Sequence, residues 1–186
     1  MSAYTRDQVL TALRLVGRLD FVGGDLTSID LSGVDLGRSS LYGAKLEKAR
    51  LKGARLYACN LEGANLSGAD LSGADLSGAD LNEADLSSAN LAGANLVGAN
   101  LTHAKLNNAN LGGANFERAD FTLADLSAAS LLDANARAAD FASANIRGAD
   151  LTGATLIDCS LRTQEYDAST RWPTGLCPPL VGAKLR

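Results

Sequence analysis

The stretch ANLSGADLSGADLSGADLNEADL, residues 64–86, repeats every five residues. Leu stands at the centre of each unit, Ala two residues before it, and Asp or Asn directly before it. Followed outward, the centre position keeps its register from Phe21 to Leu161 through 29 units, of which 23 have Leu. From residue 44 to residue 154 the position two before the centre is Ala in 22 of 23 units. A repeat of this regularity decides the architecture before any other property of the sequence.

A period of five matches neither the 3.6-residue period of an α-helix nor the two-residue period of a flat strand. It predicts a coil with flat sides, one side for each five residues. The Ala and the centre residue of each unit point inward, and the other three residues point outward. Gly is frequent two residues after the centre, where it suits a tight corner because it adopts positive φ readily. The backbone groups of each side then pair with the coils above and below.

The charges directly before the centres limit the number of sides, because like charges opposite each other on neighbouring strands are unfavourable. In a four-sided coil, Asp120 and Asp140 are the one stacked pair of acids at these positions, and Lys45, Arg50 and Arg55 each stack beside acids. A three-sided coil gives three stacked pairs of acids, and a five-sided coil gives one. The charges disfavour three sides and leave four and five open.

The A-(D/N)-L-x-x motif resembles that of the pentapeptide-repeat family, in the Leu-centred form common in cyanobacterial proteins. The resemblance covers roughly residues 19–162. It implies an all-β fold, a right-handed quadrilateral β-helix, in which the 29 units make about seven coils. At about 4.8 Å between strands, the rod is on the order of 35 Å tall. In such a coil Phe116 lies beside the small Ala136, and Phe121 lies beside Phe141.

The ends of a solenoid expose unpaired strand edges, so we expect a cap at each end. Residues 1–18 are predicted to be an N-terminal helical cap, with a helix over 5–18. Thr5 and Gln8 match a capping box, and Gly17 suits the stop. The helix is expected to cover the first coil with an apolar face, made by Val9, Leu10, Leu13 and Val16.

Residues 163–186 are predicted to be a C-terminal capping tail, because the register ends after Leu161 and the single Trp and all three Pro follow. The alternative is a tail that docks a partner. The quinolone-resistance members of the family dimerise end to end, and a capped end departs from them, so we expect a monomer or a weak dimer. The residues expected to fold over the last coil are Trp172, Leu176, Leu180 and Val181.

The composition argues against several classes of function. A net charge of −4 and a pI of about 4.9 disfavour direct nucleic-acid binding, which needs a basic face. No apolar run approaches the roughly 18 residues of a membrane span. The N-terminus lacks the pattern of a secretory signal. We therefore expect a cytoplasmic protein without a membrane partner.

No group of side chains predicts catalysis, a cofactor or a metal. Cys59, Cys159 and Cys177 lack metal-ligand spacing, and His103 is the single histidine. Cys59 and Cys159 take inward Ala positions five coils apart, too far for a disulfide, so we expect buried free thiols. The periodic carboxylates point outward, with no pocket to shift their pKa. The chain is predicted not to be an enzyme.

The candidate interaction surface is acidic. Between Leu56 and Ala104 the chain has no Lys or Arg, and a basic partner surface could recognise the carboxylates there. The alternative is a surface that maintains solubility. The preceding basic run, Lys45 to Arg55, is interpreted as counter-charge between acidic coils. The candidate residues are Glu62, Asp70, Asp75, Asp80, Glu83 and Asp85 of this acidic belt, together with Trp172.

These features predict a non-enzymatic structural or protein-interaction module that presents rigid flat faces to a protein partner, with a regulatory role in view. The alternative, implied by the resemblance to the quinolone-resistance members, is a DNA mimic that protects a type II topoisomerase, DNA gyrase. Duplex DNA carries about one charge per 1.7 Å, so a rod of this height needs roughly twenty excess charges. Residues 19–162 carry 18 acids and 11 bases, a net of −7, which favours the interaction module.

Overall fold

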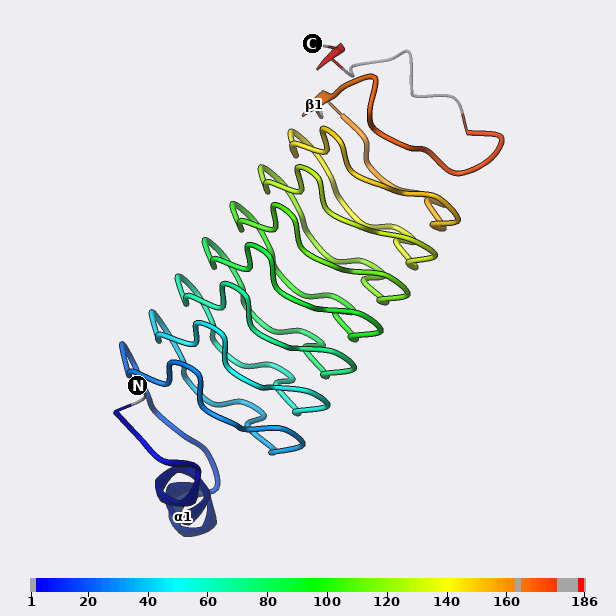
Figure 1. Cartoon of the computed structure of the whole chain (residues 1–186). Helices are drawn as coiled ribbons and strands as arrows, with labels where there is room; N and C mark the ends of the chain where they lie inside the picture. Colours follow the sequence, from blue (N-terminus) through cyan, green and yellow to red (C-terminus); the bar gives the residue numbers. More distant parts are fainter. Residues whose placement is uncertain (1–2, 163–164, 177–183, 186) are drawn as a thin grey trace.

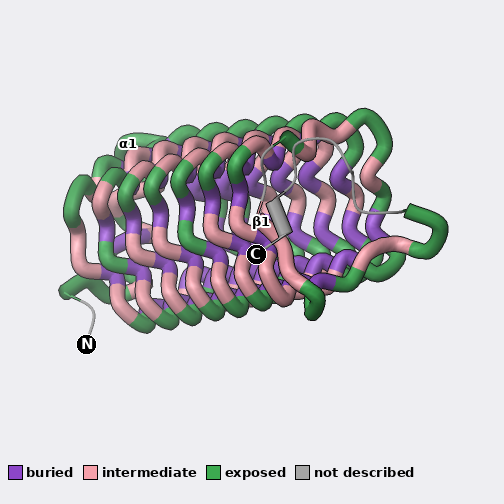
Figure 2. Tube along the Cα trace, turned by 90° about the horizontal axis from the view of Figure 1, so that it is seen from above, coloured by how far each residue is buried: buried purple, intermediate pink, exposed green. Residues whose placement is uncertain are grey.

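The computed structural model describes residues 3–162, 165–176 and 184–185. They form a right-handed, four-sided rod of stacked coils with a helix across its first coil (Figure 1). The named elements are the helix α1 (Arg6–Val16) and two short strands, β1 (Glu165–Tyr166) and β2 (Lys184–Leu185). Between α1 and β1 the described chain is held together by isolated parallel bridges. Buried residues follow the inside of the coil, and exposed residues gather at its corners (Figure 2).

Each five-residue unit is one flat side followed by one corner. At a corner, the N–H of the inward Ala donates to the C=O of the centre residue three positions earlier, as in Ala64 to Leu61 at 3.0 Å. The residue before that Ala has positive φ, the feature that defines the third position of a type II turn. Glycine adopts this φ without penalty, whereas Glu83, with φ 58°, does so at a cost of about 1–2 kcal/mol.

The bridges confirm a four-sided coil. They join residues 20 apart, from Asp20 with Ser40 to Asn145 with Glu165, and Asp120 stacks on Asp140 as predicted. We name the four sides after their first-coil residues: the Asp20, Asp25, Asp30 and Asp35 faces. The family resemblance, not the charges, distinguished four sides from five.

The interior is filled along the whole rod. Nearly all inward Ala and centre Leu residues are at most 1% exposed. The rings of Phe121 and Phe141 stack at 5.1 Å with 7° between their planes, and Phe116 meets them edge-on at 5.2 and 6.2 Å. Fully buried Ala136 lies one coil beyond Phe116. The predicted pairing of large and small interior residues is confirmed.

The helix α1 begins and ends as the sequence predicts. Thr5 is the N-cap of a complete capping box with Gln8, and Gly17 ends the helix in the left-handed conformation. Val9 is fully buried, and Leu10, Ala12 and Leu13 pack against the core.

The prediction that Val16 belongs to the buried face of α1 is wrong, because its side chain is 68% exposed. It lies on the same side of the helix as Val9, but in the last turn, where the chain turns at Gly17 into the first coil. There Val16 borders an open groove instead of the core.

The segment around α1 covers two of the four open edges of the first coil. Ala3 N–H donates to the C=O of Asp25 at 3.0 Å. The Arg6 guanidinium donates to the C=O of Asp30 at 2.7 Å and to that of Ser32 at 3.2 Å. Arg6 therefore replaces part of a missing preceding coil.

The other two edges of the first coil remain open. In every bridge the residue on the later coil uses its own N–H and C=O toward the earlier coil, as Lys45 does toward Gly24 and Leu26. The equivalent groups of Asp20 and Asp35 point out of the first coil. Within the described residues these backbone groups have no hydrogen-bond partner.

The repeat continues past Leu161, where the sequence predicted that it ends. Glu165 pairs with Asn145 in the 20-residue register, which puts Tyr166 at a centre position. Arg171 then pairs with Asp150, 21 residues earlier. The extra residue lies in a turn where the Asp167 carboxylate accepts hydrogen bonds from backbone N–H groups, those of Gly148, Ser169 and Thr170.

This partial eighth coil caps the C-terminal end of the rod, and β2 pairs with β1 beside it. Tyr166 and Trp172 pack on the last coil with their rings edge to face at 5.7 Å. Thr170 takes the inward Ala place and donates to the C=O of Ile146 at 3.1 Å. The predicted cap holds for Trp172, but Leu176 is exposed, contrary to expectation. The predicted contacts of Leu180 and Val181 lie outside the described residues.

Among the described residues, no helix has the length and apolar character needed to cross a membrane.

Candidate interaction surface

The structure spreads the acidic belt around the rod. Asp70, Asp75, Asp80 and Asp85 belong to successive units, so each lies on a different face of one coil. Glu62 and Glu83 lie at the corner that joins the Asp20 and Asp25 faces, on consecutive coils. Four of the six predicted carboxylates therefore surround this corner. We call them the acidic corner: Glu62, Asp80, Glu83 and Asp85.

The Asp carboxylates also support the fold. The Oδ1 atom of Asp75 accepts the N–H of Ser77 at 3.1 Å and the Nδ2 of Asn95, one coil on, at 2.9 Å. Asp80 is held in the same way, and Asn65 holds its own corner with the same atom. These turns therefore use the oxygen that Asp and Asn share and do not depend on the charge, while other units of the coil have neither residue, for example those of Lys45 and Ser130.

Asp70 illustrates the electrostatic balance at these positions. Burial opposes its ionisation, but hydrogen bonds from Ser72 and Asn90 and the positive charge of Lys52 outweigh that effect and lower the pKa of its carboxyl group. Asp70 is thus ionised at neutral pH, on a face that is not part of the acidic corner.

Two residues of the basic run form ion pairs with the coil before it, in line with the counter-charge that the sequence predicts. Arg50 approaches Asp30 at 3.5 Å, and Arg55 approaches Asp35 at 3.2 Å. Arg55 and Arg38 also lie over the Tyr57 ring, at 5.4 and 5.9 Å from its centroid. These contacts occupy Arg50 and Arg55 within the molecule.

The structure separates Trp172 from the acidic corner. The aromatic residue belongs to the cap at the C-terminal end, whereas the carboxylates lie near the middle of the rod (Figure 1). The predicted residues therefore form no single site.

Exposed apolar side chains gather at the N-terminal end, which the sequence interpretation missed. Val22 and Tyr42 occupy the same corner position on the first two coils and are 59% and 46% exposed. A large apolar residue at an outward repeat position was the available signal. The exposed apolar residues of this end are Tyr4, Leu15, Val16, Val22 and Tyr42.

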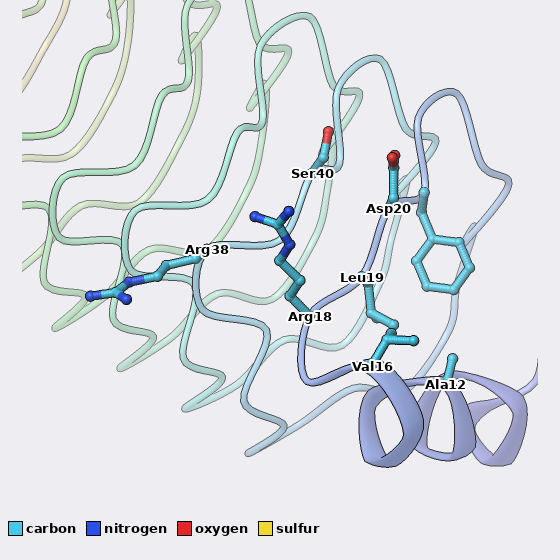
Figure 3. A pocket seen from close by; sticks show the side chains of 8 residues that line it. Ala12, Val16, Arg18, Leu19, Asp20, Arg38 and Ser40 are labelled. Atoms are coloured by element: carbon cyan, nitrogen blue, oxygen red, sulfur yellow. The ribbon is translucent and has the colours of Figure 1, made fainter.

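A groove of about 540 Å³ lies between α1 and the open edge of the Asp20 face (Figure 3). Ala12 and Val16 of α1 and Leu19 face its interior. Arg18 and Arg38 supply positive charge at its border. We call this the N-terminal groove, lined by Ala12, Val16, Arg18, Leu19, Asp20, Phe21, Arg38 and Ser40.

The prediction of a buried thiol is confirmed for Cys59, whereas Cys159 is only partly buried. Cys59 donates to the C=O of Leu36 and Cys159 to that of Ala136, both at 2.8 Å. Burial raises the pKa of each thiol to about 11. Both are free, Cys59 fully buried and Cys159 partly exposed, while Cys177 lies outside the described residues. In the described part of the chain, no three His, Cys, Asp or Glu residues gather as metal ligands.

The fold and its surface define a class: a capped β-solenoid built from five-residue units. The chain matches the family model of pentapeptide repeats, in eight copies, over more than half of its length. It therefore belongs to the pentapeptide-repeat family. The matched residues are 20–56, 49–87, 59–96, 84–122 and 119–158.

Solved structures share this architecture. HetL, a pentapeptide repeat protein involved in heterocyst differentiation regulation in the cyanobacterium Nostoc sp. strain PCC 7120, is 26% identical, with a TM-score of 0.62 over 97% of this chain and 94% of HetL. A trypsin-treated variant of QnrB1, a plasmid-mediated fluoroquinolone resistance protein, is 19% identical, with a TM-score of 0.68 over 91% of this chain and 89% of QnrB1. The QnrB1 likeness shows the fold alone. No curated protein matches the sequence.

Proposed function

We propose that this protein is a non-enzymatic interaction module that binds a protein partner through its rigid outer surface and serves a regulatory role. The observation that carries the proposal is the filled interior: the inward positions from Ala44 to Leu151 are at most 1% exposed. All chemistry available to another molecule therefore lies on the faces, corners and ends of the rod. The similarity to HetL, a regulatory protein of the same family, supports the same reading.

The acidic corner is the contact that we propose within the belt. Its four carboxylates lie on two coils around one edge of the rod. Because Asn would hold the same turns, the charges of Asp80 and Asp85 go beyond what the fold requires. A basic partner surface would complement this concentration of negative charge, and the attraction would weaken with salt.

The DNA-mimic alternative has less support. The acids are distributed over four faces and alternate with Asn on several of them, for example Asn90 and Asn110 beyond Asp70. The basic coil from Lys45 to Arg55 interrupts the negative field further. A continuous row of charges like that of a DNA backbone is therefore missing from the described surface.

Affinity capture from a native lysate of the source organism, at low and high salt, tests the proposal. The test variant is Asp80→Asn with Asp85→Asn, and the matched control is Asp70→Asn with Asp75→Asn. Both pairs remove two charges from one coil and keep the turn-forming oxygens. We expect one specific protein to bind the natural chain at low salt, to be lost with the test variant and to be kept by the control.

Three results would contradict the proposal. Equal recovery with both variants would remove the acidic corner from the interaction. Recovery of topoisomerase subunits that are lost at high salt would favour the DNA mimic. Failure to recover any specific protein at either salt would count against the interaction module itself.

A further inference from the structure

We infer that the N-terminal groove binds an extended segment of a partner protein, in which an acidic residue neighbours a large apolar residue, and that this segment adds a strand at the open edge of the Asp20 face. The inference rests on the proposed interaction function and assigns it a site and a partner chemistry. Three features of the groove carry it: a backbone edge and two arginines for which the described residues supply no pairing strand and no acidic partner, and an apolar lining.

The backbone edge calls for an extended occupant. The N–H and C=O of Asp20 point out of the first coil, and within the described residues they have no partner. Later residues of the same face use these groups to bind the preceding coil, as Asn60 does with the C=O of Ser39 and the N–H of Leu41. A peptide strand at the Asp20 edge would make the equivalent pair of hydrogen bonds.

The lining calls for an apolar side chain in the occupant. Ala12 and Phe21 are partly buried, while Val16 exposes 68% of its surface at the groove. Figure 3 shows Val16 and Ala12 on one wall and Leu19 beside them. A large aliphatic or aromatic side chain inserted here would cover Val16 and remove apolar surface from water.

Two arginines and a single carboxylate, that of Asp20, line the groove, and this excess of positive charge favours an acidic neighbour for that side chain. Arg18, which follows α1, and Arg38, at a corner of the first coil, both line the groove. In the described part of the chain neither forms an ion pair, and the one partner seen for Arg38 is the Tyr57 ring at 5.9 Å. Guanidinium groups bind carboxylates with paired hydrogen bonds, so an arginine at this border suits an Asp or Glu of the partner.

The groove on the opposite side of α1 is a weaker candidate. It borders the open Asp35 edge, but the Asp35 carboxylate is paired with Arg55 at 3.2 Å. Of its two arginines, Arg6 already binds the backbone of Asp30 and Ser32, which leaves Arg14 alone for an acidic occupant. The charge complementarity that identifies an occupant at the N-terminal groove is therefore weaker there.

A displayed library of random 12-residue peptides, selected on the full chain, tests the inference. We expect the selected peptides to share an acidic residue beside a large apolar residue. The affinity of the strongest peptide is then measured by fluorescence anisotropy. Arg18→Glu and Arg38→Glu should each weaken binding by about tenfold or more, since each removes a charged hydrogen bond.

Matched controls separate the groove from general electrostatics. Arg118→Glu makes the same change at the same repeat position four coils away and should leave the affinity unchanged. Val16→Ser should weaken binding, whereas Leu15→Ser, on an exposed helix position outside the groove, should not. N-methylation of single peptide amides should abolish binding at the positions that pair with Asp20.

Several outcomes would overturn the inference: no selected peptide, equal loss with Arg118→Glu, or an N-methylation scan without effect. The failure of the groove is distinguishable from failure of the proposed function. If peptides do not bind but the lysate capture still depends on Asp80 and Asp85, the proposed groove site is disproved and the interaction module is still supported. If peptides bind as expected while the capture fails, the groove site is supported and the contact through the acidic corner is disproved.

Discussion

At the scale of single residues, the oxygen shared by Asp and Asn explains why the repeat accepts both. The Oδ1 atoms of Asp75 and Asn65 each accept a backbone N–H two residues on, at 3.1 and 3.0 Å. An Asn one coil after an Asp adds a bond to the same atom, as Asn95 does to Asp75. Charge is then adjustable at these positions without a change of fold.

Two replacements of Asp75 distinguish the role of its Oδ1 oxygen as a hydrogen-bond acceptor from the role of its negative charge. Asp75→Asn keeps the acceptor and should change the free energy of unfolding by less than about 0.5 kcal/mol. Asp75→Ala leaves the Ser77 N–H and the Asn95 amide without their acceptor and should cost about 1–2 kcal/mol. Denaturant unfolding of the two variants measures the difference, and equal stabilities would contradict this role of Oδ1.

The phenylalanine cluster sets a limit on residue 136. Ala136→Phe adds a ring beside Phe116, where the interior is already filled, and should destabilise the chain by about 1–3 kcal/mol. Combining it with Phe116→Ala should recover part of that loss, because the added ring then has space. Thermal unfolding checks both variants, and a higher melting temperature for Ala136→Phe alone would disprove the pairing.

The buried thiols predict a dependence of stability on high pH. In the unfolded chain a cysteine loses its proton near pH 9.0, whereas burial raises the pKa of Cys59 and Cys159 to about 11 in the fold. The folded state therefore binds these protons more tightly. The contribution of the thiols is fully present below pH 9 and is lost as the pH rises toward 11.

Unfolding measured between pH 8 and pH 11 tests this dependence. The control carries Cys59→Ala and Cys159→Ala and retains every other titrating group, so it should lose less stability over the same interval. Identical pH profiles for the control and the natural chain would show that the thiols contribute nothing.

At the scale of elements, α1 shows what sequence periodicity can and cannot supply. The capping box and Gly17 determine both ends of the helix through local hydrogen bonds, and they were predictable. The exposure of Val16 was not, because periodicity identifies a helix face but does not tell where the covered coil ends. The backbone contacts of Arg6 were also unpredictable, since they join residues 24 and 26 positions apart.

Removal of the Arg6 side chain is expected to destabilise the first coil. Arg6→Ala removes both hydrogen bonds to the edge carbonyls and should cost about 1–2 kcal/mol. Arg6→Lys should recover only part of it, because an ammonium group does not reproduce the planar fork of guanidinium. Arg14→Ala, an exposed position on the same helix, is the control, and thermal unfolding is the measurement. Equal effects of Arg6→Ala and Arg14→Ala would refute the edge-capping role.

The C-terminal element shows how one inserted residue conceals a repeat. Tyr166 follows Leu161 at the normal interval of five, but Trp172 follows Tyr166 at six, and Thr170 stands where Ala is expected. A search for a strict period stops before these units. The bridge between Asp150 and Arg171 reveals them through pairing, which the sequence alone does not contain.

At the scale of the whole molecule, the flat faces and the filled interior were predictable, because the motif recurs in every coil. The coil length of 20 residues came from the family resemblance, because the charges left four and five sides open. The candidate site was only partly predictable from the sequence. The sequence named the carboxylates, but their gathering at one corner follows from a four-sided coil. The N-terminal groove depends on where α1 crosses the first coil, which no repeat pattern specifies.

Removal of the tail tests the role of the C-terminal cap. A chain that ends at Arg162 loses β1 and Trp172, and it uncovers strand edges and apolar residues of the last full coil, Ile146 and Leu151 among them. Uncovered edges promote association. We expect a lower melting temperature and a dimer or larger assembly in light scattering. A truncated chain that stays monomeric with an unchanged melting temperature would show that the tail is no cap.

Paired residues lie 20 positions apart along the rod, and the interval changes to 21 between Asp150 and Arg171. The length of the rod is therefore set by the number of 20-residue coils before this change. Any full coil can template another, so a cassette of 20 residues inserted in the middle would lengthen the molecule by one step of about 4.8 Å. The one-residue shift at the C-terminal end would still end the longer rod in the same kind of cap. The Asp20 edge and Asp80 lie on one face, three such steps apart. The span between the two proposed contacts is therefore set in whole coils, and repeat duplication could retune it without rebuilding either contact.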